Sequence, residues 1–84
     1  MLPRFMSAGA GIEKRSNVCG GAACVIGTRI PVWLLEEARR SGKGEAELLH
    51  MYPTLRAADL ANAWTYVESH RDEIEREIVE NEAA

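Results

Sequence analysis

Residues 31–42 read PVWLLEEARRSG, and this stretch carries helix signals at its start, along its length and at its end. Pro31 suits a first helical turn because its missing N–H would be unpaired there anyway. The apolar positions follow the spacing of one helix face, and they are Pro31, Leu34, Leu35 and Ala38. Arg39 and Arg40 favour the negative end of the helix dipole, and Gly42 is a natural C-terminal stop. The stretch predicts a helix over about residues 31–41.

Two further helices are predicted downstream. Residues 45–51 place acids in a first turn and offer Leu48 and Leu49 as a buried face, and Pro53 ends the segment. A third helix begins near Arg56 or Ala57, and its apolar stripe consists of Leu60, Ala63, Trp64 and Val67. The predicted core is therefore Leu34, Leu35, Leu48, Leu49, Leu60 and Trp64.

The apolar stripe of the third helix skips Arg71 and resumes at Ile74 and Ile78. Two interpretations remain open: one long helix runs to about Glu80, or a break near residues 69–72 separates two helices. Three helices joined by tight turns are the skeleton of a helix-turn-helix domain, although many small three-helix bundles share that order.

The segment before the first helix predicts a small β element. Residues 12–15 and 23–26 pair as a hairpin across a turn at residues 17–21. Such a hairpin is marginal alone, so it must lie on the helices or on a second copy of itself. Residues 1–10 have no periodicity and are expected to form a flexible arm. We therefore expect three parts: the arm over 1–10, a hairpin and three-helix domain over 11–70, and an acidic helical extension over 71–84.

The charge of this 84-residue chain is unevenly distributed. Its net charge is −3, but residues 1–44 carry a net +4 and residues 45–84 a net −7. A basic front and an acidic rear suggest two different partners, while two ordinary solvated surfaces are the alternative. Because a chain this small has a poor ratio of core to surface, we expect a homodimer.

The sequence shows no apolar run of membrane-spanning length and no continuous apolar segment near its N-terminus. We therefore expect a cytoplasmic protein without membrane contact, in which Cys19 and Cys24 are reduced.

Catalysis is not expected. His50 and His70 belong to no Ser/His/Asp or Cys/His pattern, and we interpret both as helix-face or surface residues. Cys19 and Cys24 lack the second ligand pair of a usual zinc site, so small packed thiols are favoured over a metal or a redox pair. No phosphate-binding loop follows Gly27. The sequence predicts a binding module rather than an enzyme, with no cofactor and no metal.

One segment supports a family resemblance. Residues 20–32 read GGAACVIGTRIPV, and residues 41–42, 52–55 and 70–74 continue the likeness with SG, YPTL and HRDEI. The chain resembles the family called domain of unknown function 433. The resemblance implies a mainly α, homeodomain-like three-helix (helix-turn-helix) bundle with an N-terminal β element. It also implies the role of an antitoxin paired with a PIN-like ribonuclease toxin. Contact with its own operator DNA through the basic half of the chain is our further hypothesis.

The chain departs from the family pattern at three places. Ala22 and Ala23 replace Lys-Pro, Gly44 replaces a usual Ser cap, and Arg56 stands where Thr often caps the third helix. We expect Thr54 to recover part of that cap one turn earlier.

Two sets of contact residues follow from this interpretation. The DNA contacts are expected at Arg29, Arg56 and Asn62, and the toxin contacts at Arg71, Ile74, Glu75, Arg76 and Ile78. The alternatives are an Arg29 side chain paired with a carboxylate or a helix end, and an acidic tail that is merely solvated. Trp33 lies off the apolar stripe and is a candidate for a dimer or partner interface. The alternative function is a stand-alone helix-turn-helix DNA-binding protein without a toxin.

Overall fold

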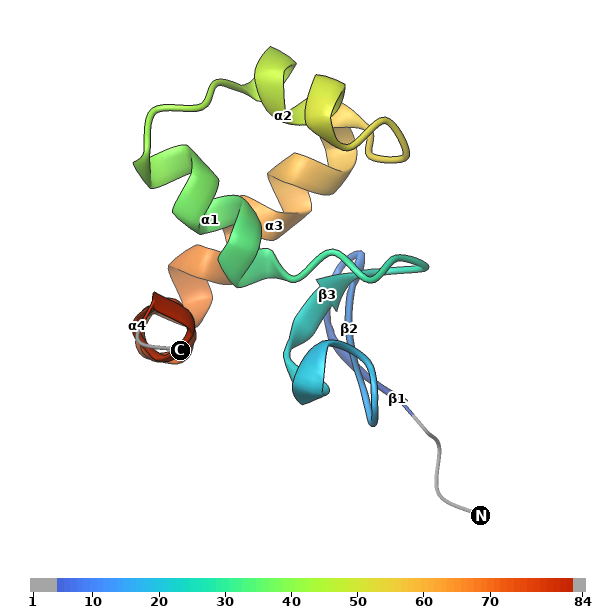
Figure 1. Cartoon of the computed structure of the whole chain (residues 1–84). Helices are drawn as coiled ribbons and strands as arrows, with labels where there is room; N and C mark the ends of the chain where they lie inside the picture. The colour runs from blue at the N-terminus through green and yellow to red at the C-terminus, as the bar shows by residue number, and fades with distance from the viewer. Residues whose placement is uncertain (1–4, 83–84) are drawn as a thin grey trace.

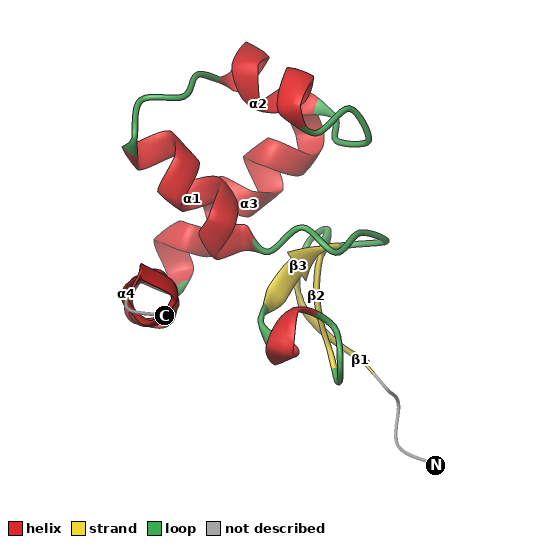
Figure 2. Cartoon of the chain, viewed as in Figure 1, coloured by secondary structure: helices red, strands yellow, loops and turns green. Residues whose placement is uncertain are grey.

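A small antiparallel sheet and four helices make up residues 5–82, the part of the chain that the computed structural model describes (Figure 1). The elements in chain order are β1 (Phe5–Gly9), β2 (Ile12–Arg15), the 3-10 turn η1 (Cys19–Gly21), β3 (Ala23–Val25), α1 (Val32–Arg40), α2 (Glu45–Met51), α3 (Ala57–Ser69) and α4 (Arg71–Glu82). The protein is therefore mainly helical, with its sheet at the N-terminal end (Figure 2).

The predicted hairpin is confirmed, and the sheet is larger than expected. β2 pairs with β3 in antiparallel register, with Ile12 opposite Val25. β1 pairs with the other edge of β2, so the prediction of a flexible arm over residues 1–10 is wrong for Phe5–Gly9. Residues 1–4 lie outside the described part of the chain. The sequence of β1 shows no alternation of apolar and polar residues that would have predicted a strand. Backbone hydrogen bonds to the neighbouring strand hold β1 in the sheet, and these do not depend on side-chain pattern.

The turn between β1 and β2 rests directly on α3. Gly11 has a positive φ of 70°, and a Cβ there would lie 2.5 Å from Asn62 Nδ2. A side chain at this position would therefore be strained and would also displace Asn62. The glycine allows the sheet to approach the helix layer closely.

The helix boundaries agree with the sequence, apart from one cap. Residues 45–51 form α2, and a break at His70 separates α3 from α4, so the interpretation with two helices is confirmed. Arg56 is the N-cap residue of α3, and its N–H donates to Asp59 Oδ2 at 2.8 Å. The expectation that Thr54 caps this helix is wrong, because Asp59 at the third helical position supplies the acceptor.

The core lies between β2, β3 and all four helices. Its largest fully buried side chains are Ile12, Val25, Val32, Leu35, Leu48, Leu60, Val67 and Ile74. Leu34 and Leu49 are only partly buried, and Leu34 stands outside the core cluster. The predicted stripe of α1 was therefore one residue out of phase, because Val32 rather than Pro31 leads the buried face.

Trp64 is a smaller part of the core than the sequence predicted. It is partly buried at the edge of the cluster, and the Arg39 guanidinium lies 4.0 Å from the centroid of its ring. Tyr66, which is 3% exposed, takes the interior place on α3 instead. The Arg39 guanidinium covers one face of the Trp64 ring. The prediction that Trp64 is a fully buried core residue was therefore wrong, although the residue does pack against the core.

Helix α4 belongs to the same core and is not an extension beyond it. Ile74 and Ile78 are buried, and α4 packs chiefly on α1 (Figure 1). The expected boundary between residues 70 and 71 is therefore a break between helices and not a boundary of the packed body.

No helix in the described part of the chain is both long and apolar enough to cross a membrane.

Candidate functional site

Glu73 fastens α4 to α3 and to the sheet. The Tyr66 hydroxyl donates to Glu73 Oε2 at 2.6 Å, and Lys14 Nζ donates to Glu73 Oε1 at 3.1 Å. Burial opposes the charged form of Glu73, but these two hydrogen bonds outweigh it and hold the pKa of the carboxyl below its usual value. Burial, together with the same carboxylate, raises the pKa of Tyr66. Glu73 is thus used in holding the fold.

Arg40 fastens α4 to α1. Its guanidinium lies 2.9 Å from Glu36 Oε2 and 2.8 Å from Glu75 Oε1, and Glu36 is buried. Hydrogen bonds to these two carboxylates raise the pKa of Arg40. Arg39 also pairs with Glu36 at 2.6 Å. The Arg40–Glu75 pair therefore joins α1 to α4, whereas the Arg39–Glu36 pair lies within α1.

The structure divides the residues expected to contact a toxin. Ile74 and Ile78 lie in the protein's own core, so their prediction as contact residues is wrong for the folded chain. The sequence spacing of these two residues would be the same for a helix that packs on a partner and for one that packs on its own protein. Glu75 pairs with Arg40, and its side chain is 55% exposed. Arg71 is exposed and pairs with Glu68 at 2.6 Å, and Arg76 is exposed.

Among the remaining acids of α4, Asp72, Glu80 and Glu82 are exposed, and Glu77 is partly buried. The helix carries six carboxylates and two arginines. Within residues 5–82, four of these carboxylates take part in no ion pair, and they are Asp72, Glu77, Glu80 and Glu82. We call these four residues the acidic face of α4.

A groove adjoins this face. It has a volume of about 460 Å³ and is lined by Cys19, Gly20, Ala22, Pro31, Trp33, Glu77, Glu80 and Asn81. Three elements meet there, namely η1, the start of α1 and the second half of α4. The sequence singled out Trp33 as an interface candidate but not Glu77, because the fold alone brings these two distant residues to one groove.

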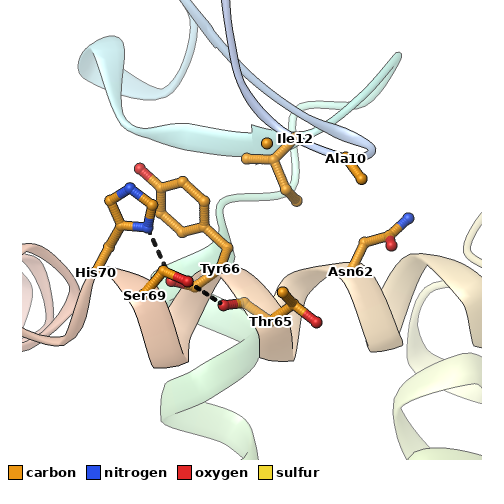
Figure 3. A pocket seen from close by; sticks show the side chains of 8 residues that line it. Ala10, Ile12, Asn62, Thr65, Tyr66, Ser69 and His70 are labelled. Carbon is orange, nitrogen blue, oxygen red and sulfur yellow. Dashed lines mark hydrogen bonds between the residues drawn. The ribbon is translucent and has the colours of Figure 1, made fainter.

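A second cavity is smaller and lies beneath the β1–β2 turn (Figure 3). Its volume is about 80 Å³, and Asn62, Tyr66 and His70 are among its lining residues. The rings of Tyr66 and His70 stack with 3.8 Å between centroids, and His70 Nδ1 lies 3.0 Å from the Tyr66 carbonyl oxygen. Its polar groups are largely engaged within the chain, so the cavity is best explained as a packing feature.

The residues expected to contact DNA are not equally accessible. Arg29 is exposed in the loop before α1, and Arg56 is exposed at the start of α3. No ion pair of Arg29 occurs among the described residues, so the pairing of its side chain with a carboxylate is not seen there. Asn62 is partly buried against Gly11, so it is the least accessible of the three predicted DNA contacts.

The two cysteines are thiols in different surroundings. Cys24 is buried, while Cys19 is partly exposed and donates to the Arg29 carbonyl oxygen at 3.2 Å. Burial, with a further contribution from the neighbouring Cys19 thiol, raises the pKa of Cys24 to about 12. Cys24 therefore remains protonated at neutral pH and is a packing residue. Among residues 5–82, no group of three or more His, Cys, Asp and Glu side chains has the arrangement of a metal site.

Comparisons with known proteins agree with this architecture. The family model described as "Protein of unknown function (DUF433)" matches residues 12–67, two thirds of the chain. A crystal structure of a DUF433 member protein from Anabaena variabilis ATCC 29413 is similar, with 46% sequence identity and a TM-score of 0.80. That match covers 82% of this chain and 68% of the other. No curated protein matches the sequence. The chain belongs to the DUF433 family.

Proposed function

We propose that this protein is an antitoxin that binds and neutralises a PIN-like ribonuclease through the acidic face of α4. The carrying observation is that α4 has six acids against two arginines, while among residues 5–82 the ion pairs that join α4 to other elements use only Glu73 and Glu75 of these acids. Of the other acids, Asp72, Glu80 and Glu82 are exposed and available to a partner. The apolar stripe of the helix meanwhile faces its own core, so the partner meets charge rather than a hydrophobic face.

A ribonuclease is a suitable partner for such a surface. It needs basic residues to hold the phosphates of RNA, and these would meet the carboxylates of α4. The metal-binding carboxylates of a nuclease centre would repel the same acids. Arg71 and Arg76, both exposed on α4, are therefore the better candidates for contacts at that centre.

Co-expression tests the proposal. The full chain is produced with the PIN-like ribonuclease encoded beside it, and RNA cleavage by the purified complex is compared with that of the nuclease alone. We expect a stable complex and loss of cleavage. A nuclease that cleaves equally well with the protein present, or a genome without such a neighbouring gene, would contradict the proposal.

Operator DNA is the second candidate partner. The order of α2, a short turn and α3 fits a homeodomain-like helix-turn-helix, and Arg56 is exposed where α3 begins. A net charge of −3 argues against strong autonomous binding, because nonspecific affinity comes from phosphate neutralisation. Arg56→Ala should weaken operator binding and reduce its salt dependence by about one charge. An unchanged salt slope would remove Arg56 from the interface.

We also propose that the protein is a cytoplasmic homodimer. Among the residues whose side chains the structure describes, three large apolar ones are exposed, namely Ile26, Met51 and Val79. A second copy that covered part of this surface would add stability to a small core. Sedimentation at micromolar concentration should give the mass of a dimer, and a monomer over that whole range would reject the idea.

A further inference from the structure

The groove between η1, α1 and α4 combines features that suit a cation. Its lining includes Trp33 from α1 together with Glu77 and Glu80, which lie one helical turn apart on α4. In Figure 1, α4 and the segment between β2 and β3 that contains η1 both lie below the start of α1, and residues from these three elements line the groove. An aromatic ring and two carboxylates that line the same groove attract positive charge.

Glu77 lacks the partners that its neighbour Glu73 has. Glu77 Oε1 is buried, and no donor in the described part of the chain forms a hydrogen bond with it. Burial raises the pKa of Glu77, and the charge of Glu73 raises it further. A buried carboxylate oxygen without a donor is costly, so an incoming donor with positive charge would relieve that cost.

The start of α1 does not supply that donor. A helix N-terminus has unpaired N–H groups and attracts anions, so it is the obvious intramolecular partner for these glutamates. Pro31, which lines the groove, is the N-cap residue and has no N–H. Within residues 5–82, no hydrogen bond joins Glu77 or Glu80 to the first turn of α1. The two carboxylates are not explained as caps of that helix.

The chain's other tryptophan shows what Trp33 lacks. Trp64 is covered by the Arg39 guanidinium at 4.0 Å, and Arg39 at the same time pairs with Glu36. This is a stacked guanidinium held by a carboxylate, made within the protein itself. Among the described residues, Trp33 has the carboxylates nearby but no cation over its ring.

We propose that this groove receives an arginine side chain from a protein partner, with the guanidinium against Trp33 and its N–H groups directed to Glu77 and Glu80. Arginine suits the groove better than lysine because its planar group can stack on the ring and donate to two carboxylates together. The proposed function is needed only to identify the partner as a basic nuclease. The proposed recognition of arginine depends only on the residues that line the groove.

The two tryptophan indole N–H signals in a ¹⁵N NMR spectrum provide the test. The full-length protein is titrated with N-acetyl-arginine methylamide, with the corresponding lysine derivative, and with the uncharged citrulline derivative. We expect the Trp33 signal to move saturably with the arginine probe, less with lysine and not with citrulline. The Trp64 signal should stay in place. A stationary Trp33 signal, equal movement of both indoles, or a lysine response as large as the arginine response would overturn the proposal.

Variants of the two glutamates locate the effect. Glu80→Gln and Glu77→Gln should each weaken binding of the arginine probe about tenfold or more, as expected when a charged hydrogen-bond partner is lost. Glu47→Gln is the matched control, because it makes the same change on the exposed side of α2. Glu80 is exposed, so its variant keeps the test valid should Glu77→Gln disturb the fold. Binding that is unaffected in both variants would contradict the assignment.

Failure of this inference can be distinguished from failure of the proposed function. If Trp33 does not respond to the arginine probe but the nuclease is still neutralised, the groove is not the contact and the function stands. If the groove binds the probe but no nuclease complex forms, the groove assignment stands and the antitoxin proposal fails.

Discussion

At the scale of single residues, Glu73 and Glu77 lie one helical turn apart, and the fold shifts their pKa values in opposite directions. The pKa of Glu73 is held down, despite its burial, by donors from Tyr66 and Lys14. The pKa of Glu77 is raised by burial and by Glu73. The fold thus stabilises one carboxylate and destabilises the other, and the destabilised one lines the groove.

Replacing Glu77 with Gln should therefore stabilise the free protein at neutral pH. A folded-state pKa above the unfolded value means that Glu77 favours folding below the unfolded pKa, and this contribution is lost as pH rises through the folded pKa. The advantage of Glu77→Gln should appear at pH 7 and shrink in acid, as measured by urea denaturation at both pH values. Glu82→Gln, an exposed change on the same helix, is the control. A variant less stable than the parent at pH 7 would show that Glu77 has a stabilising partner.

Tyr66→Phe should have the opposite effect. It removes the 2.6 Å hydrogen bond to Glu73 and should cost about 1–3 kcal/mol of unfolding free energy at neutral pH. The lowered pKa of Glu73 contributes stability above its unfolded pKa, and this is lost as pH falls through the folded pKa. The loss in Tyr66→Phe should therefore be largest near pH 7 and smaller in acid. Tyr52→Phe is the control, and a loss that does not vary with pH would argue against the role of Glu73.

At the scale of elements, α4 is both a structural helix and a charged surface. The apolar spacing of Ile74 and Ile78 was visible in the sequence, but it predicted a partner contact. The structure uses these side chains to close the core against α1. Truncation after His70 should therefore unfold the body, contrary to what an extension would allow.

Ile78→Ala should cost about 2–5 kcal/mol of unfolding free energy, because it opens a cavity in the core. Val79 is the next residue and is 53% exposed, so Val79→Ala should change the stability by only about 0.5 kcal/mol. Urea denaturation of both variants measures the difference. Equal and small losses would mean that α4 is dispensable for folding, as the sequence first suggested.

At the scale of the whole molecule, the sequence predicted the local elements better than their packing. Pro31, Gly42 and Pro53 marked helix ends correctly because their backbone chemistry acts locally. The Gly11–Asn62 contact and the pairing of β1 depend on residues far apart in the chain, and no spacing rule reveals them. The helical spacing placed Trp64 on the apolar stripe of α3, whereas the buried aromatic residue of this helix is Tyr66.

The candidate site was only partly visible for the same reason. The acidic character of residues 71–82 is a property of composition and was evident at once. Which of these acids are used in the fold depends on Lys14 and Arg40, which come from other elements. The groove joins residues 19–22, 31–33 and 77–81, and such a juxtaposition exists only in the folded chain.

The central claim is that carboxylates of α4 that are not used in the fold bind a basic nuclease. Calorimetric titration of the neighbouring PIN-like ribonuclease with the double variant Glu80→Gln/Glu82→Gln tests it most directly, with Glu45→Gln/Glu47→Gln on α2 as the control of equal charge change. We predict that the α4 variant binds more weakly than the parent, most clearly at low salt where screening is least, and that the α2 variant binds as the parent does. Equal affinity of the α4 variant and the parent at low salt, or equal weakening in both variants, would contradict the account.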